Sequence, residues 1–476
     1  MTLAIVLCTC LLLLPWLVVF GRYIIRRPEA IPTPVWMVTA SVVLLFVGPL
    51  VMNATTSGLE GSGQAASAGR IMYATLAYWI MFTLTYRLMS FGRRTVSPDG
   101  PTGMQTAFGT LKAASASVRP APAFILYAVV LAFQTYLIRG YGLGVSGSGL
   151  AMMNLPYGLV VVYMLTRTGL MPFTAIFTTQ LFSRSPQWVK LGAVTGLCVN
   201  AVLAAMAGRR ELLYTLLLAS FGLTWSGRRR GALSLVAAGL AAWFVFGVFS
   251  PIFLQARNIW HEKNGPGVVE AFRIAIERSM NGDERASAAS EENIRARSNS
   301  LRFWLDLYDQ QGSRTLGGTL LAQAFLMNIP RAISGWAKYA FGATEEYVLG
   351  TADIANNVSL ISFIDAGTLG PLLYGALFGL ILAFTDMLIA AIGLRNRYIA
   401  IVASGAMIPF LFSPEADLMG YVSVLRSALI YFAMAAGVSF VIGRFPGVLG
   451  IDHRGTPSAG SAPLAMHGPA PTFHFR

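Results

Sequence analysis

Residues 205–232 read AMAGRRELLYTLLLASFGLTWSGRRRGA, an apolar run with charged residues at both ends. Arg-Arg-Glu opens the run at 209–211, and three arginines close it at 228–230. Arginine and lysine concentrate in the cytoplasmic loops of membrane proteins, so we expect the closing triplet on the cytoplasmic side. A helix over 211–227 then places the opening Arg-Arg-Glu at the outer face, where arginine is disfavoured.

The composition of the whole chain agrees with a membrane protein. Of the 476 residues, 55% are apolar and only 12% are charged, whereas soluble domains carry about 25% charged residues. A membrane-spanning helix needs roughly 20 apolar residues. We therefore predict an all-α, polytopic membrane protein with about eleven transmembrane helices and one large helical periplasmic loop. The predicted spans are 3–21, 34–53, 71–91, 121–138, 149–166, 190–207, 211–227, 231–250, 367–393, 398–413 and 422–443.

The distribution of charge gives the predicted topology. The net charge of +14 comes from basic residues in short loops between apolar runs, which is typical of membrane topology and gives little support for nucleic-acid binding. The N-terminus is predicted outside and the C-terminus inside. The stretch 170–189 is short and polar at its end, so we place it, together with Arg167, at the cytoplasmic interface. The three cysteines lie in apolar runs and suggest neither a disulfide framework nor a metal site.

Four regions follow from this topology. N-terminal transmembrane helices occupy 1–250, and a periplasmic loop with amphipathic helices occupies 251–366. C-terminal transmembrane helices occupy 367–443, and a cytoplasmic tail rich in Gly, Pro, Ser and Ala, predicted to be disordered, occupies 444–476. The loop holds 13 of the 21 acidic residues and 11 of the 35 basic ones. Because long loops are commonly functional, it is the first place to search for a site.

The arginines at the outer face have two interpretations. An arginine at a helix end can extend its head group to the lipid interface, and Glu211 favours a helix N-terminus. The paired Arg209 and Arg210, on the side where arginine is disfavoured, favour instead a site that holds an anion. Arg257 follows in PIFLQARNIWHEKNG, close to His261, which is more often a structural residue than a catalytic one.

The loop segment RARSNSLRFWLDLYDQQGSR, 295–314, places four polar residues on one helix face. They are Arg295, Asn299, Arg302 and Asp306. A solvated charged face explains this pattern. A groove for a glycan or phosphate also explains it, because arginine binds phosphate with two parallel hydrogen bonds, and Trp304 and Tyr308 could stack on sugar rings.

Two further segments lead back to the membrane. AFLMNIPRAISGWAKYAFGATEEY, 324–347, carries Arg331 and Lys338 opposite an apolar stripe, which an interfacial helix alone would explain. The following TADIANNVSLISFIDAGTLGPLLYGALFGLILAF, 351–384, enters the bilayer at Gly367 and Gly370. Its small residues should allow close backbone approach at the outer leaflet.

This layout resembles the O-antigen polymerase (Wzy-type) family, which is related to the O-antigen ligases within the GT-C-like glycosyltransferases that use lipid-linked donors. The resemblance rests on AGRRELLYTLLLAS with its basic cytoplasmic turn, on the large loop one span later, and on the Pro-Arg segment and small-residue helix start just quoted. It covers roughly 190–393. The characteristic late-loop histidine of the ligases has no match, since no histidine lies between 261 and 453.

The resemblance implies a function and a set of roles. The expected activity is polymerisation of undecaprenyl-pyrophosphate-linked repeat units into O-antigen or exopolysaccharide, at the periplasmic face of the bacterial inner membrane. No cofactor or metal is implied, so arginine must stabilise the leaving pyrophosphate, and a carboxylate would be the general base. The implied partners are the lipid-linked donor and acceptor, the bilayer, a chain-length regulator and a flippase. Catalytic candidates are Arg210, Arg302, Asp306 and Glu211; substrate-binding candidates are Arg209, Arg257, Arg295, Arg331, Lys338, Trp304 and Tyr308; Asp353 and Asp365 are further candidates for the base.

Other functions stay open. A ligase-like transferase would use the same donor. A polysaccharide or lipid transporter predicts charged residues at mid-membrane and often a repeat between halves. Only Asp386 lies well inside a predicted span, and no repeat is visible. An acyltransferase would more often show a His-Asp pair on a membrane helix, and a structural assembly partner is a further alternative.

Overall fold

The computed structural model describes 31, 33–42, 65–90, 96–97, 100–101, 106–141, 156–227, 231–261, 266–281, 304–305, 307–309, 315–329, 357–412 and 418–444. These residues are helical apart from turns, caps and one antiparallel pair of two-residue strands, β1 (Val96–Ser97) and β2 (Gly100–Pro101). The all-α class predicted from the sequence is therefore confirmed for the described part of the chain.

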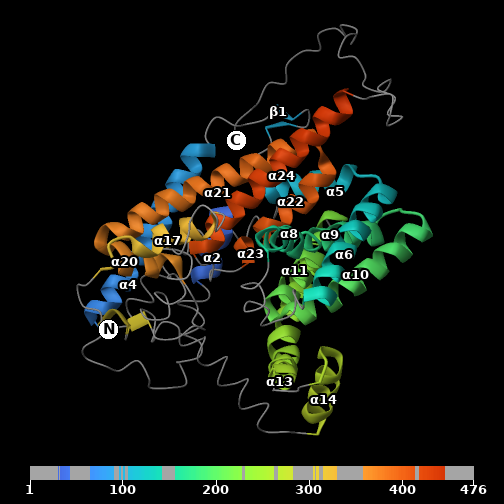
Figure 1. The fold of residues 1–476 in the computed structure, drawn as a ribbon, viewed down its shortest axis with the longest axis horizontal. Helices are drawn as coiled ribbons and strands as arrows, with labels where there is room; N and C mark the ends of the chain where they lie inside the picture. The colour runs from blue at the N-terminus through green and yellow to red at the C-terminus, as the bar shows by residue number, and fades with distance from the viewer. Residues whose placement is uncertain are drawn as a thin grey trace, which may run out of the picture.

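The helices are arranged along the chain as follows (Figure 1). They are α2 (Thr33–Val42), α4 (Ala65–Ser90), α5 (Ala107–Ser117), α6 (Pro120–Tyr141), α8 (Tyr157–Arg167), α9 (Met171–Phe182), α10 (Gln187–Ala207), α11 (Arg209–Trp225), α12 (Gly231–Trp243), the π-helix η4 (Phe244–Phe249), α13 (Ser250–His261), α14 (Val268–Met280), α17 (Thr319–Met327), α20 (Val358–Ala366), the 3₁₀ turn η5 (Gly367–Leu369), α21 (Gly370–Arg395), α22 (Arg397–Ser404), the 3₁₀ turn η6 (Gly405–Met407), α23 (Ile408–Phe412) and α24 (Leu418–Arg444).

Five stretches of helix in the described residues are long and apolar enough to cross a membrane. They are Pro120–Tyr141, Gln187–Ala207, Val236–Trp260, Val358–Arg395 and Gly420–Phe440. These helices agree with the prediction of a membrane protein. The predicted number of about eleven spans is not confirmed. Predicted span 3–21 lies outside the described residues, and 211–227 forms a helix of only 17 residues.

Helices α4 and α21 form the most extensive contact of the fold and lie side by side in Figure 1. Gly375 and Gly379 on α21 lie one turn apart, facing α4. A Cβ atom at Gly375 would lie 2.4 Å from the carbonyl oxygen of Tyr78, and one at Gly379 would lie 2.5 Å from that of Phe82. The two backbones thus touch directly, as small residues permit in membrane helices. The predicted close approach is also confirmed at Gly370, where a Cβ would lie 1.9 Å from the carbonyl oxygen of Ser362.

The acid inside α21 joins four helices. Asp386 is 3% exposed and accepts hydrogen bonds from the Tyr86 hydroxyl, the Thr33 hydroxyl (3.1 Å) and the backbone N–H of Ala107 (2.8 Å). These donors belong to α4, α2 and the first residue of α5. Burying a carboxylate is costly unless it is hydrogen-bonded, and three donors satisfy this one. These structural hydrogen bonds are enough to explain why an acidic residue is buried at position 386.

Helix α9 (Met171–Phe182) lies inside the bundle, whereas the sequence predicted an interfacial segment over 170–189. It packs on α10 and α11 and is buried along most of its length. The polar end of the stretch, 183–189, follows the helix, and within α9 the Thr178 hydroxyl donates to the Thr174 carbonyl at 2.8 Å and the Thr179 hydroxyl to the Ala175 carbonyl at 2.8 Å. Such bonds within the helix allow hydroxyl groups to be buried among apolar helices.

Helices α13 and α14 lie side by side, away from α24 (Figure 1). An amphipathic helix, as predicted for the loop 251–366, is present as α14 (VVEAFRIAIERSM), with Ala271, Phe272 and Ala275 toward α13. Ala271 and Ala275 are fully buried against α13, whereas Val269 is 81% and Ile276 is 43% exposed. The small alanines let the two helices approach closely, and Phe272 packs beside them against Phe253 and Trp260 of α13.

Candidate functional site

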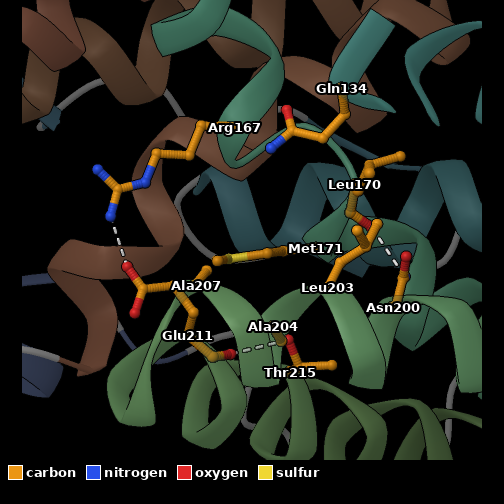
Figure 2. Close-up of a pocket in the computed structure, with 10 residues that line it drawn as sticks. All are labelled: Gln134, Arg167, Leu170, Met171, Asn200, Leu203, Ala204, Ala207, Glu211 and Thr215. Atoms are coloured by element: carbon orange, nitrogen blue, oxygen red, sulfur yellow. Dashed lines mark hydrogen bonds and ion pairs between the residues drawn. The ribbon is translucent and has the colours of Figure 1, made fainter. Parts of the chain in front are cut away.

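A cleft lies where α6, α10 and the start of α11 meet the turn between α8 and α9 (Figure 2). It is a small cleft that opens to the surface, with an interior volume of about 40 Å³. Apolar side chains make up half of its lining, and a few polar groups converge among them. The lining residues are Gln134, Arg167, Leu170, Met171, Asn200, Leu203, Ala204, Ala207, Glu211 and Thr215. Mostly apolar concavities with a few placed polar groups are the usual form of small-ligand sites.

The charged pair of this cleft is Arg167 with Glu211. Nη2 of Arg167 donates to Oε1 of Glu211 at 2.6 Å, and the two side chains are 36% and 16% exposed. The guanidinium also lies 5.9 Å from the centre of the Tyr163 ring. Glu211 is in the first turn of α11, where the helix dipole favours an anion. Because the apolar lining limits hydration, each charge acts more strongly here than it would at an open surface.

The position of Glu211 depends on the turn between α10 and α11. Gly208 ends α10 with an N–H bond to the Ala204 carbonyl (2.9 Å), and its own carbonyl accepts from the Leu212 N–H (3.1 Å). Its φ of +149° is one that side-chain-bearing residues rarely adopt. A Cβ at Gly208 would lie 3.0 Å from Oε2 of Glu211. The carboxylate therefore packs over a position where only glycine fits without adjustment.

We expect Gly208→Ala to impair function more than the same change at Gly227, just beyond the other end of α11. The strained φ should cost about 1–3 kcal/mol of stability, and the new methyl group should displace the Glu211 carboxylate from Arg167. Thermal unfolding of the purified protein in detergent measures the first effect, and activity measures the second. Gly227→Ala is the control, since nothing lies within 4 Å of its added Cβ. Equal behaviour of the two variants would contradict this account of the turn.

Asn200 lines one wall of the cleft, and both polar atoms of its side chain have hydrogen-bond partners. Its Oδ1 accepts from the Tyr127 hydroxyl at 3.0 Å, and its Nδ2 donates to the Leu170 carbonyl (3.1 Å) and to the Thr174 hydroxyl oxygen (3.0 Å). Asn200 thereby holds α6, α9 and α10 in register. This register fixes the turn after Arg167 and brings the guanidinium to Glu211.

The other predicted residues near α11 lie outside this lining. Nη1 of the half-buried Arg209 donates to the Ser250 hydroxyl at 2.6 Å and ties α11 to the start of α13. Arg210 is exposed, and the half-buried Arg257 is two turns beyond Ser250. Of the Arg-Arg-Glu motif, Glu211 alone is among the residues that line the cleft.

The contact of Arg167 with Glu211 corrects the predicted position of Arg167. We placed Arg167 at the cytoplasmic face and Glu211 at the outer face, and two groups 2.6 Å apart cannot lie on opposite sides. A short turn, 168–170, separates α8 from α9, which is buried in the bundle along most of its length. Arg167 therefore lies on the same side as Glu211.

Trp304 and Tyr308 do not face a ligand, contrary to the sugar-stacking prediction. Trp304 is fully buried, and Tyr308 is 2% exposed with its hydroxyl donating to the Leu360 carbonyl at 2.7 Å. The Tyr308 ring stacks on Phe363 of α20, with ring centres 5.3 Å apart. The prediction assumed that these residues lie on an exposed helix. The packing of Tyr308 on α20 contradicts that assumption.

Asp365 also has a structural role. It is fully buried, and its two carboxylate oxygens each accept from a backbone N–H at the start of α17, those of Leu320 and Leu321, both at 3.1 Å. The Tyr374 hydroxyl donates to it as well. Asp365 thus caps α17 and is not placed to act as a base.

Several predicted residues lie outside the described side chains: His261, Arg295, Arg302, Asp306, Arg331, Lys338 and Asp353. The structure adds three residues that sequence reasoning did not select: Gln134, Arg167 and Asn200. A signal was present, because Gln134 and Asn200 are amide side chains within apolar runs, and intramembrane polar residues are often functional.

Comparisons of the chain with models of known protein families, with curated proteins and with solved structures find no match.

Proposed function

We propose that this protein is a glycosyltransferase that polymerises undecaprenyl-pyrophosphate-linked repeat units at the periplasmic face of the bacterial inner membrane. The observation that carries the proposal is the Arg167–Glu211 ion pair in a largely apolar cleft. It lies at the α10–α11 turn, where the resemblance to the O-antigen polymerases implies an anion site.

The pair supplies both groups that the reaction needs. The glycosidic carbon–oxygen bond breaks with its electron pair leaving on the pyrophosphate, so a cation must stabilise the developing charge. Arg167 can provide it, and a pyrophosphate that engages Arg167 would compete with Glu211 for the guanidinium. Glu211 is then released to accept the proton of the attacking sugar hydroxyl as general base. In the absence of substrate, each charge neutralises the other.

The proposal includes the predicted topology. Within it α8 and α9 share one crossing, so the direction of every later span and the total of about eleven are unchanged. The ends of α6 and α10 and the start of α11 then face the periplasm, together with the loop 251–366. Arg209, Arg210 and Arg257 would line the approach of the anionic donor, and a chain-length regulator and a flippase would be the protein partners.

The surface glycan of a deletion strain tests this function. We expect single unpolymerised repeat units on the cell surface, with polymer restored by the wild-type protein. Loss of all surface glycan would indicate a flippase, and polymer that remains on the undecaprenyl carrier would indicate a ligase. An unchanged polymer would rule out the proposal. Gel analysis of the extracted glycan, with mass spectrometry of the carrier lipid, distinguishes the four outcomes.

A further inference from the structure

Helix α24 carries a charged residue inside a stretch that is long and apolar enough to cross a membrane. Arg426 belongs to Gly420–Phe440 and lies about 9 Å along the helix axis from the first residue of that stretch. Side chains of a helix lean toward its N-terminus. The guanidinium is therefore displaced toward the end at which α24 begins, near the level of lipid head groups.

The guanidinium of Arg426 has no counter-charge in the part of the chain that the structure describes. Its Nε is buried and donates to no acceptor there, and neither Nη group has a hydrogen bond or an ion pair with the described residues. Two carboxylates belong to neighbouring helices, since Asp386 is in α21 and Asp365 caps α17, and both helices pack on α24. Their oxygens already accept from other groups.

The Arg426 side chain is held by the protein on one side and open on the other. The residue is half-buried, with Nε closed off and the two Nη groups accessible. Leu429, Gly437 and Phe440 follow on the same helix face. Leu429 is 45% and Phe440 is 62% exposed, and a Cβ at Gly437 would meet nothing within 4 Å. This face leaves room for an acyl chain along α24, below the guanidinium.

An unpaired arginine is costly inside a membrane, and such residues pair with groups of opposite charge. A phosphate is the matching group, because the planar guanidinium can donate two parallel hydrogen bonds to it. An arginine that merely extends to the lipid interface keeps its whole head group in water. The buried Nε of Arg426 differs from that arrangement and fixes the direction of the fork.

We propose that Arg426 binds the phosphate of an anionic phospholipid, in the leaflet where α24 begins. An anionic lipid is favoured over a zwitterionic one, because the ammonium group of the latter offsets the negative charge that Arg426 requires. The acyl chains then lie along the exposed face that begins at Leu429. Arg426 is not among the residues that line the cleft, so this lipid site is independent of the proposed reaction.

The chain offers a matched control in Arg139 of α6. Arg139 is exposed and lies near the end of Pro120–Tyr141, another stretch long enough to cross a membrane. Its head group can therefore reach the interface freely. Arg139→Met and Arg426→Met each remove one positive charge, so any non-specific attraction of the protein for anionic lipid falls equally in both.

The test is thermal unfolding of the full chain in detergent, after removal of co-purified lipid and then with added dioleoyl phosphatidylglycerol or dioleoyl phosphatidylcholine. Phosphatidylglycerol should raise the unfolding temperature of the wild type and of Arg139→Met by about 3 °C more than phosphatidylcholine does. Arg426→Met should lose this difference. Arg426→Lys, which keeps the charge but not the fork, should retain only part of it. Without lipid, Arg426→Met should unfold at the wild-type temperature or higher, because an unpaired charge is gone.

Four results would overturn the inference. The first is a wild-type protein that responds equally to the two lipids. The second is a phosphatidylglycerol effect that persists in Arg426→Met or falls equally in Arg139→Met. The third is a lower unfolding temperature of both Arg426 variants without lipid, which assigns Arg426 a partner within the protein. The fourth is stronger stabilisation by undecaprenyl pyrophosphate than by phosphatidylglycerol, lost in Arg426→Met, which assigns the site to a lipid-linked substrate. The surface glycan of the deletion strain tests the proposed function separately.

Discussion

Glu211→Gln should lower the rate of polymer formation by about a thousandfold, within the range of general-base catalysis, while the bundle stays folded. Glutamine has the same shape and its amide oxygen can still accept from Arg167, but it cannot take a proton from an attacking hydroxyl. Removing one member of a buried ion pair is usually destabilising. Here the Arg167 side chain is 36% exposed, so water can solvate the remaining charge.

The measurement is polymer formed per amount of protein, in liposomes supplied with lipid-linked repeat units. Glu270→Gln is the matched control, since Glu270 of α14 also pairs with an arginine, Arg273, at 2.5 Å. The hydrogen bond from Arg273 lowers the pKa of the Glu270 carboxyl, yet both groups are exposed and lie away from the cleft. We expect that variant to behave as wild type. A Glu211→Gln protein with near-normal activity would exclude Glu211 as the base and return attention to Asp306 and Asp353.

Gly375→Ala combined with Gly379→Ala should destabilise the protein by about 3–4 kcal/mol, the cost of overpacking at two contacts. Each added methyl group would meet a backbone oxygen of α4, at 2.4 and 2.5 Å. A backbone carbonyl cannot rotate away as a side chain can, so α4 and α21 must separate. Since α4 also carries Tyr86, which donates to Asp386, the separation should loosen α2 and α5 as well.

Thermal unfolding in detergent and the amount of protein in isolated membranes measure this effect. Gly239→Ala is the control, because α12 leaves open space at that glycine and alanine favours a helix. It should be neutral or slightly stabilising. Equal unfolding temperatures for the double variant and the control would show that α4 and α21 do not touch as described.

The sequence alone was sufficient for features that depend on local pattern. Apolar runs predicted α10, α11, α21 and α24 to within a few residues at most ends, because a helix satisfies its backbone from its own residues. The Arg-Arg-Glu at 209–211 marked the start of α11, because charged residues open the apolar run there. The glycines of 351–384 indicated close packing before its partner was known.

Which helices become neighbours was decided by the tertiary structure, and the site depends on that choice. Arg167 and Glu211 are 44 positions apart, and they meet because Asn200 holds the α8–α9 turn against α10. Trp304 and Tyr308 look like ligand-stacking residues in the sequence, but Tyr308 packs on α20 and Trp304 is buried beside Tyr308. The stretch 170–189 looks interfacial because it is short and polar at its end, yet α9 is buried once α10 and α11 pack on it. Hydropathy measures what a residue would prefer in isolation, whereas burial and ion pairing depend on the partner that the fold supplies.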